Sequence, residues 1–292
     1  MNVLGSMFAS TISGLAPLLP VALAGLATEY VGVLNIALEG LILLGGFAFV
    51  LVGSQAGVVA GLAAAMIVAS TAAWVADRFA VKTQADPFVV GLGLNLLAPG
   101  LVSLVSQARF GTKGVVPVPQ LVSSRLFGSF DELPGLIGTL AGHRYSDYLA
   151  LFFALLIALV LGTTPLGLRL RATGANPDTL RLAGLDPKRT RGLAFALSGL
   201  ACGVSGAVLA AGIGAWVPNL SAGRGWIALV AIYLGGRRLG GTIMATAVFA
   251  LLMATAGLGQ AIPGAQADLL MALPYLLTAC VVVIGSRLRK QS

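Results

Sequence analysis

The sequence predicts an all-α protein that crosses a membrane several times. Of its 292 residues, 58% are hydrophobic and only 10% are charged, whereas an ordinary soluble domain carries about 25% charged residues. The charges are clustered, and they leave long uncharged stretches at 1–28, 40–76, 87–108, 148–168, 192–223, 239–267 and 269–286. Each has at least about 18 residues, enough to span a bilayer, and backbone groups in hydrocarbon favour helices over open strands.

We expect about eight transmembrane helices within a single membrane domain over residues 1–292. They are placed near 7–28, 31–52, 56–77, 87–107, 148–165, 190–213, 241–258 and 269–286. A further helix at about 225–236 is too short to span the membrane alone and is expected to be re-entrant. The first helix has no basic residues before it and no convincing cleavage site, so we expect it to be retained, unlike a signal peptide.

Basic residues next to the predicted helices indicate the orientation of the chain. They gather in and just after the loop 166–190, at Arg237 and Arg238, and at the C-terminus. Because cytoplasmic loops are rich in Lys and Arg, we assign all three places to the cytoplasm. The N-terminus and the segment 108–147 are then external, although that segment also carries basic residues. The same rule explains the net charge of +8 without nucleic acid as a partner.

The loop 166–190 contains two successive helix-start signals. Asn176 is suited to cap a helix, with Pro177 at the first position and Asp178 near the positive helix end. Gly184 suits the left-handed position that ends a helix, and Asp186 repeats the start signal before the next span. The pattern predicts a short helix at about 177–183, outside the membrane. An ordinary positively charged loop is the alternative, but it has no need of these caps.

This loop and three other stretches resemble a known family. The stretch "GLRLRATGANPDTLRLAGLDPKRTRGLAFALSGLACGVSGA" is similar to the cytoplasmic coupling segment of permease subunits in bacterial ABC importers, in the branch of simple-sugar and purine-nucleoside permeases. The stretches "GVLNIALEGLILLGG", "DPFVVGLGLNLLAPGLVS" and "PNLSAGRGWIALVAIYLGG" agree with it in the same order. The chain looks closer to the nucleoside-type branch, although Ala37 replaces the usual first glycine of its Asn-Ile-Gly-Leu-Glu-Gly motif.

The resemblance implies a coupling helix that docks in a groove of a cytoplasmic ATPase. The residues that it assigns to this coupling are Asn176, Pro177, Asp178, Leu180, Arg181, Gly184 and Asp186. It also implies a second homologous permease, an external substrate-binding protein or lipoprotein, and a place in the bacterial cytoplasmic membrane. We expect this chain to bind no cofactor, since ATP and Mg²⁺ belong to the partner ATPase.

Polar side chains inside the predicted spans are candidates for the substrate pathway, because they are costly in lipid. Asn35 and Glu39 are four residues apart and so share a helix face, with Glu39 near the middle of the predicted helix 31–52. Asn95 lies near the middle of the predicted helix 87–107. Each of the three either lines the translocation path or forms hydrogen bonds to a neighbouring helix.

The stretch "WVPNLSAGRGW" holds further candidates around a proline and two glycines. Broken helical backbone is expected where it borders a cavity. We therefore assign Trp216, Asn219, Arg224 and Trp226 to the substrate pathway. Either tryptophan could stack on a flat base, but anchoring at the membrane interface is the preferred alternative.

Motifs of enzyme chemistry are missing from the sequence. It has no GxxxxGK[ST] phosphate loop, His143 has no metal-ligand spacing around it, and Cys202 and Cys280 form no metal motif. We expect a transport subunit with no catalytic or metal-binding residues: an ABC importer permease for nucleosides, with purine nucleosides first. Riboflavin and simple sugars remain alternatives, and so does a stand-alone ion-coupled transporter or channel.

Overall fold

The computed structural model describes residues 3–125 and 142–259 of the chain. Its helices are α1 (Val3–Tyr30), α2 (Leu38–Thr83), α3 (Pro87–Phe110), α5 (Tyr145–Thr163), α6 (Pro165–Ala175), α7 (Pro177–Leu182), α8 (Pro187–Ile213), α9 (Arg224–Leu234) and α10 (Leu239–Gly259). Six helices of this described part are long and apolar enough to cross a membrane. The protein is a polytopic all-α membrane protein, as predicted. The predicted helix 269–286, Cys280 and the basic C-terminus lie outside the described residues.

Helix α2 is a hairpin of two helical arms, because its backbone turns at Gly57 with φ of 85° and ψ of 171°. This backbone region is open to glycine and closed to almost every other residue. The first arm covers residues 38–56 and the second covers 58–83. Gly53 and Gly61 lie so close across the turn that a methyl group on Gly61 would be 2.9 Å from the Gly53 Cα. The arms correspond to the predicted helices 31–52 and 56–77.

The predicted helix 31–52 is wrong in its first seven residues. Residues 31–37 are not helical, and α2 begins only at Leu38. Gly32, with a φ of 79°, redirects the chain after α1 ends at Tyr30. The segment is as apolar as a helix would be, and apolar composition alone does not distinguish the two conformations. Helix α6 was not predicted either, and it fills much of the expected loop 166–190.

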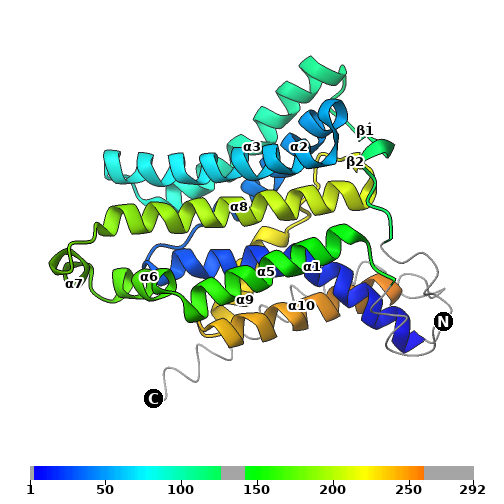
Figure 1. The fold of residues 1–292 in the computed structure, drawn as a ribbon. Helices are drawn as coiled ribbons and strands as arrows, with labels where there is room; N and C mark the ends of the chain where they lie inside the picture. Colours follow the sequence, from blue (N-terminus) through cyan, green and yellow to red (C-terminus); the bar gives the residue numbers. More distant parts are fainter. Residues whose placement is uncertain (1–2, 126–141, 260–292) are drawn as a thin grey trace.

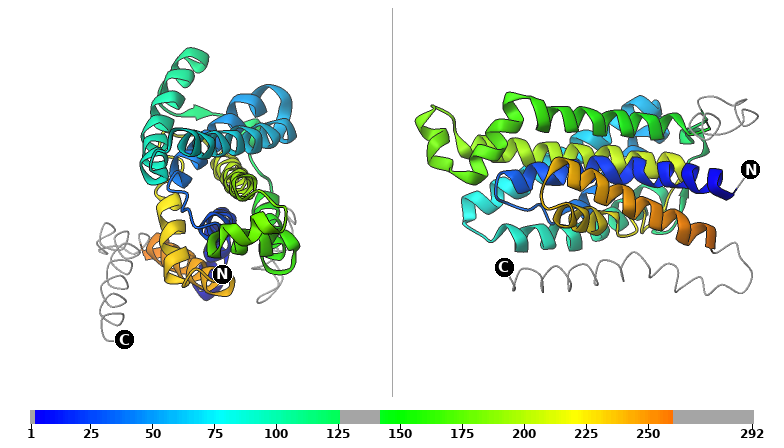
Figure 2. Two further views of the ribbon diagram at one scale, coloured as in Figure 1. Left: turned by 90° about the vertical axis from the view of Figure 1, so that its left-hand side faces the viewer. Right: turned by 90° about the horizontal axis from the view of Figure 1, so that it is seen from below.

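The long helices run along one common axis, with α6 and α7 projecting at one end, here called the α7 end (Figure 1, Figure 2). Contacts bring basic residues of separate loops together there. Arg78 donates to the Lys188 carbonyl, and Arg237 pairs with Glu29 at the end of α1. Helix α9 returns the chain to this end, as the predicted orientation requires. The strands β1 (Val116–Pro117) and β2 (Ala215–Trp216) pair antiparallel at the opposite end.

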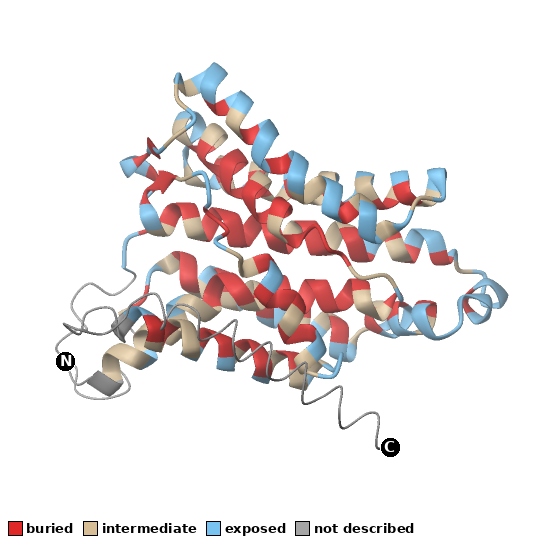
Figure 3. Ribbon diagram, turned by 180° about the vertical axis from the view of Figure 1, so that it is seen from behind, coloured by how far each residue is buried: buried red, intermediate tan, exposed pale blue. Residues whose placement is uncertain are grey.

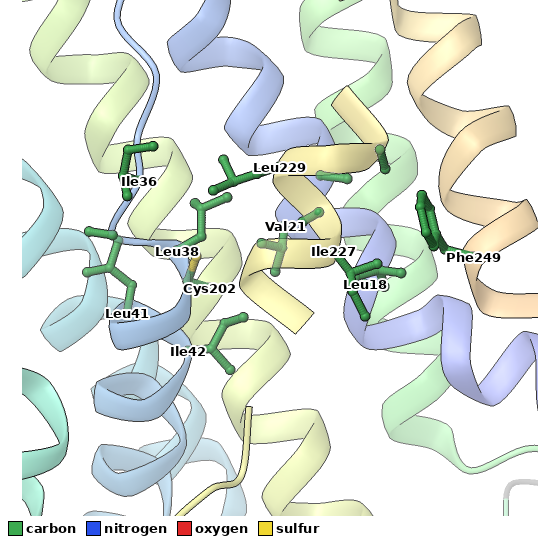
Figure 4. Packing of buried hydrophobic residues seen from close by; sticks show 14 of the residues in the cluster. Leu18, Val21, Ile36, Leu38, Leu41, Ile42, Cys202, Ile227, Leu229 and Phe249 are labelled. Carbon is green, nitrogen blue, oxygen red and sulfur yellow. The ribbon is translucent and has the colours of Figure 1, made fainter. Parts of the chain in front are cut away.

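Helix α8 lies at the centre of the bundle and α3 at its edge (Figure 3). In the most apolar 18 residues of each helix, 72% of the residues of α8 are buried inside the protein, but only 17% of those of α3. The main core cluster joins α1, the first arm of α2, α8, α9 and α10 (Figure 4), with Leu18, Leu38, Cys202, Ile227 and Phe249 among its members. The outer surface of α3 is thus left to lipid or to another protein.

Glycines allow α2 and α8 to pack with their backbones in contact. A methyl group on Gly199 or Gly203 of α8 would overlap the carbonyl oxygen of Ala69 or Ala65 on the second arm of α2. The neighbouring Gly206 meets the first arm in the same way, at the Ile42 carbonyl. Small residues at such positions are typical of helix contacts in membranes. The two arms of α2 and α8 therefore form one tightly packed unit.

We predict that Gly203→Ala destabilises the protein by about 1–3 kcal/mol, the usual cost of overpacking. The methyl group would meet backbone atoms that cannot rotate away. Gly93→Ala on α3 is the matched control, because nothing lies within 4 Å of the added methyl group. Thermal unfolding of both purified variants in the same detergent measures the effect. Equal melting temperatures for the two variants would contradict the packing described for α8.

Candidate functional site: two broken helices that meet in the bundle

Two interrupted helices meet near the middle of the bundle. The extended residues 31–37 lead into the first arm of α2, and residues 217–223 lead from β2 into the short helix α9. The first turns of these two helices are in direct contact, since a Cβ on Gly225 would overlap the backbone of Glu39. Figure 4 shows Leu38 beside Cys202, halfway along α8, with α9 close by. Both helices thus begin inside the protein, where their free N–H groups need partners.

Glu39 supplies the partners for α9. Its Oε1 accepts a hydrogen bond from the Gly223 N–H at 2.8 Å, and its Oε2 accepts one from the Gly225 N–H at 2.7 Å. Helix α9 has no side-chain cap of its own, because Gly223 occupies its N-cap position. The carboxylate also lies in the first turn of α2, so its negative charge faces the positive ends of two helix dipoles. The charge of Glu39 is therefore balanced by backbone groups of both helices.

Two asparagines hold the extended segment 31–37 in the same manner. Asn95 of α3 accepts a hydrogen bond from the Gly40 N–H at 2.7 Å and donates one to the Ile36 carbonyl at 2.8 Å. Asn35 accepts a hydrogen bond from the Ala37 N–H and donates one to the Ser198 Oγ, both at 3.0 Å. Asn35, Glu39 and Asn95 are thus engaged with the protein itself, mostly with backbone groups at the two breaks.

Of the other four pathway candidates, one is buried and three are exposed or partly exposed. Trp216 is 2% exposed and packs edge-on against Phe47, with ring centres 5.2 Å apart. Its side chain therefore belongs to the core and is not free to stack on a base. Asn219 and Trp226 are exposed, and Arg224 is partly exposed and donates to the Ser221 carbonyl. The exposed side of residues 219–226 is thus the face of the broken region that a solute or a partner subunit could reach.

Helix α7 has the caps expected from its sequence. The Asn176 Oδ1 accepts hydrogen bonds from the N–H groups of Asp178 and Thr179, at 3.0 and 3.4 Å, and Pro177 is the first helical residue. Gly184 has a φ of 73° where the chain leaves the helix. Asp186 then caps α8 by accepting a hydrogen bond from the Lys188 N–H at 2.9 Å. The exposed Asp178 and Arg181 form an ion pair at 2.6 Å.

The apolar residues of α7 differ from the expectation in their exposure. Leu180, assigned to the coupling contact, is 4% exposed and packs inward. Leu182, which was not among the predicted coupling residues, is 91% exposed on the outside of the same helix. The alternation was visible in the sequence, but which of the two leucines turns inward depends on the packing of α6 and α8. Asp77 and Arg191, which form a buried ion pair, were also missed.

His143 is part of a polar contact between α1 and the start of α5. His143 is buried, with its Nδ1 3.1 Å from the Ser13 Oγ and 4.0 Å from a carboxylate oxygen of Asp147. Among the described residues, no group of three or more His, Cys, Asp or Glu side chains could hold a metal ion.

Broken helices that meet inside a multi-pass bundle are a feature of membrane transport proteins. The chain is a member of the family described as branched-chain amino acid transport system / permease component, whose pattern matches residues 7–282. It is 29% identical to the nucleoside ABC transporter permease protein NupC of Lactococcus lactis subsp. cremoris, over 97% of this chain and 93% of that protein. It is 28% identical to the guanosine ABC transporter permease protein NupQ of Bacillus subtilis, over 95% and 91%.

Sugar permeases are also among the relatives. A putative glucose ABC transporter permease protein of Haloferax volcanii is 27% identical over 86% of this chain and 77% of its own length. No solved structure matches the chain.

We predict that Glu39→Gln loosens the start of α9, because an amide offers one acceptor oxygen where the carboxylate offers two. Loss of a hydrogen bond to a charged group costs about 1.5–3 kcal/mol. Hydrogen exchange followed by mass spectrometry is expected to show faster exchange at Gly223 and Gly225, together with a lower melting temperature.

Glu29→Gln is the matched control for this substitution. Glu29 pairs with Arg237 at 3.0 Å, and the two side chains are 10% and 55% exposed. Because the arginine keeps much of its contact with water, we expect this pair to contribute as surface pairs do, about 0–1 kcal/mol. Unchanged exchange at Gly223 and Gly225 in Glu39→Gln would show that the carboxylate does not hold α9.

Proposed function

We propose that this chain is the transmembrane permease subunit of an ATP-driven importer of nucleosides, with purine nucleosides first. The observation that carries the proposal is the combination of two contacting broken helices with a separately capped helix, α7, at one end of the bundle. Membership of the permease family and near full-length similarity to nucleoside and guanosine permeases support the substrate class. ATP and Mg²⁺ are bound by a partner ATPase in this proposal.

In this proposal the α7 end faces the cytoplasm and the N-terminus lies outside, in agreement with the basic residues at the α7 end. The complex contains a second homologous permease, two ATPase domains and an external substrate-binding protein. The substrate passes between the permeases along the exposed side of residues 219–226, with Asn219, Arg224 and Trp226 in contact with it. Asn35, Glu39 and Asn95 support this surface from behind through the hydrogen bonds described above.

Coupling to the ATPase takes place at α7. A helix that is capped at Asn176 and terminated at Gly184 keeps its shape when it is pushed, so it carries a displacement to its neighbours. Leu182 is the apolar side chain that α7 presents outward. An exposed leucine on a cytoplasmic helix fits a hydrophobic pocket of a partner, and buried apolar anchors of this kind dominate the energy of protein interfaces.

We predict that Leu182→Asp weakens the association with the ATPase by about 2 kcal/mol or more, the range of interface anchors. Because Leu182 makes no core contact, the permease itself is expected to keep its melting temperature. Co-purification of the tagged permease with the ATPase measures the association, and Leu182→Met is the control that preserves an apolar side chain. Full association of Leu182→Asp would place the docking contact elsewhere.

The substrate is tested by uptake into proteoliposomes that contain the assembled complex and the external binding protein. We expect ATP-dependent uptake of radiolabelled guanosine or adenosine, with competition by unlabelled nucleosides and none by riboflavin or glucose. If riboflavin is retained and taken up and nucleosides are not, the substrate is riboflavin and the proposed substrate class is wrong. Uptake by the lone chain without ATP would contradict the importer.

A further inference from the structure

A buried ion pair joins the second arm of α2 to the first turns of α8. The side chain of Asp77 is fully enclosed, and its Oδ1 is 2.5 Å from the Nε of Arg191. Arg78, the next residue, approaches the other carboxylate oxygen at 3.5 Å and donates to the Lys188 carbonyl. The backbone of Gly192 leaves room for this arginine, since a Cβ there would overlap the guanidinium group. Two arginines, one from each helix, thus surround one carboxylate.

An enclosed carboxylate between two helices costs more free energy of desolvation than an apolar contact does. Taking charges out of water costs several kcal/mol per ion in real proteins, and well-packed apolar residues often hold a contact equally well. The charged pair adds a contact of defined direction, because a guanidinium group bonds a carboxylate in a fixed orientation. The pair therefore fixes how the start of α8 is placed along α2.

Arg191 lies close to α7 along the chain. Helix α7 ends at Leu182, and α8 begins at Pro187, with Asp186 as its cap. Arg191 follows only five residues after Asp186, within the first turns of α8. A displacement of α7 thus passes through one short capped turn to Arg191. On the other side, Asp77 belongs to the arm of α2 that leads to the turn at Gly57, the first arm and Glu39.

An open pocket lies beside Arg191. It has a volume of about 400 Å³ and is lined by residues of the segment 31–37, the end of the second arm of α2, the start of α3, α6, α7 and α8, among them Val31, Ala80, Pro87, Thr173, Pro177 and Arg191. The joint between α6, α7 and α8 is thus bordered by open space, and the ion pair of Arg191 with Asp77 bridges α8 to α2 beside it. Helix α6 also packs against the end of α1, since a Cβ on Gly174 would overlap the Tyr30 carbonyl. The ion pair is the contact through which movement of α7 can reach α2.

We propose that Asp77 and Arg191 are positioning residues that transmit the displacement of α7 to α2, and through Glu39 to the start of α9. This rests on the proposed function, in which α7 docks on the ATPase. The two residues touch neither the substrate nor the ATPase. Their removal therefore separates ATP hydrolysis from transport while the complex remains assembled.

The test compares three variants in the full complex: Asp77→Asn, Arg191→Gln, and the double variant. Asp77→Asn removes the negative charge between the two arginines, and Arg191→Gln leaves Asp77 with Arg78 alone. We expect each change to lower uptake per ATP hydrolysed about tenfold, in line with the coupling energies of residues between two sites. ATPase activity and co-purification are expected to stay near their original values. In the double variant the two amides can bond each other, so it is expected to recover much of the coupling, which a double-mutant cycle measures.

Arg189→Gln is the matched control, since it removes the same charge from the same helix start. Arg189 is 87% exposed and pairs only at the surface, with Asp186 at 3.6 Å. We expect its uptake per ATP to remain unchanged. An equal loss of coupling in Arg189→Gln, or full coupling in both Asp77→Asn and Arg191→Gln, would overturn the link.

A spectroscopic measurement on the full permease chain in nanodiscs is independent of substrate and ATPase. Spin labels are placed at Lys82 on α2 and at Ala183, the residue directly after α7, and both residues are exposed. Cys202 and Cys280 are first replaced by Ala. We expect the distribution of label-to-label distances to be narrow in the otherwise unaltered permease, broad in Asp77→Asn, and narrow again in the double variant. A narrow distribution in Asp77→Asn contradicts the link even where transport is impaired. Absence of nucleoside uptake by the unaltered complex would instead contradict the proposed function.

Discussion

The need to satisfy backbone groups inside the bundle governs the centre of this structure. Two helices begin there, and in a membrane interior no water reaches their free N–H groups. The chain meets this need with side chains from other elements, namely Glu39 for α9, Asn95 for the start of α2 and Asn35 for its own segment. The position of α9 against α2 and the course of residues 31–37 depend on these few hydrogen bonds.

Local signals in the sequence were sufficient for α7 but not for the broken helices. The caps of α7 lie within three residues of the groups they satisfy, so Asn176, Pro177 and Gly184 identify the helix without knowledge of the fold. The segment 31–37 is different, because it is apolar except for Asn35 and its hydrogen-bond partners come from α1, α3 and α8. Hydropathy therefore extended a helix across it. The candidate Glu39 was recognisable as a costly charge, but its partners lie 184 and 186 residues further along the chain.

Burial decided the remaining differences between expectation and structure. Trp216 was expected at a surface, but the pairing of β1 with β2 draws it into the core beside Phe47. Leu180, which was predicted to form the coupling contact, is buried, and Leu182 is the exposed leucine, since α7 is too short for its apolar period to indicate a face. Asp77 lies at the end of a predicted helix, where a charge is ordinary. Only its enclosure against Arg191 makes it unusual.

The bonds of Glu39 also limit how the broken helices can move. Breaking both would cost about 1.5–3 kcal/mol each, and shifting a two-state equilibrium from one conformation almost fully to the other takes about 5.5 kcal/mol. A transport cycle that broke these bonds in each turnover would therefore spend as much free energy on the joint as on the conformational change itself. Movement of α9 together with the first arm of α2, as one body, avoids that cost. The non-helical segment 31–37, which connects that body to α1 and borders an open pocket, would then have to change its backbone conformation.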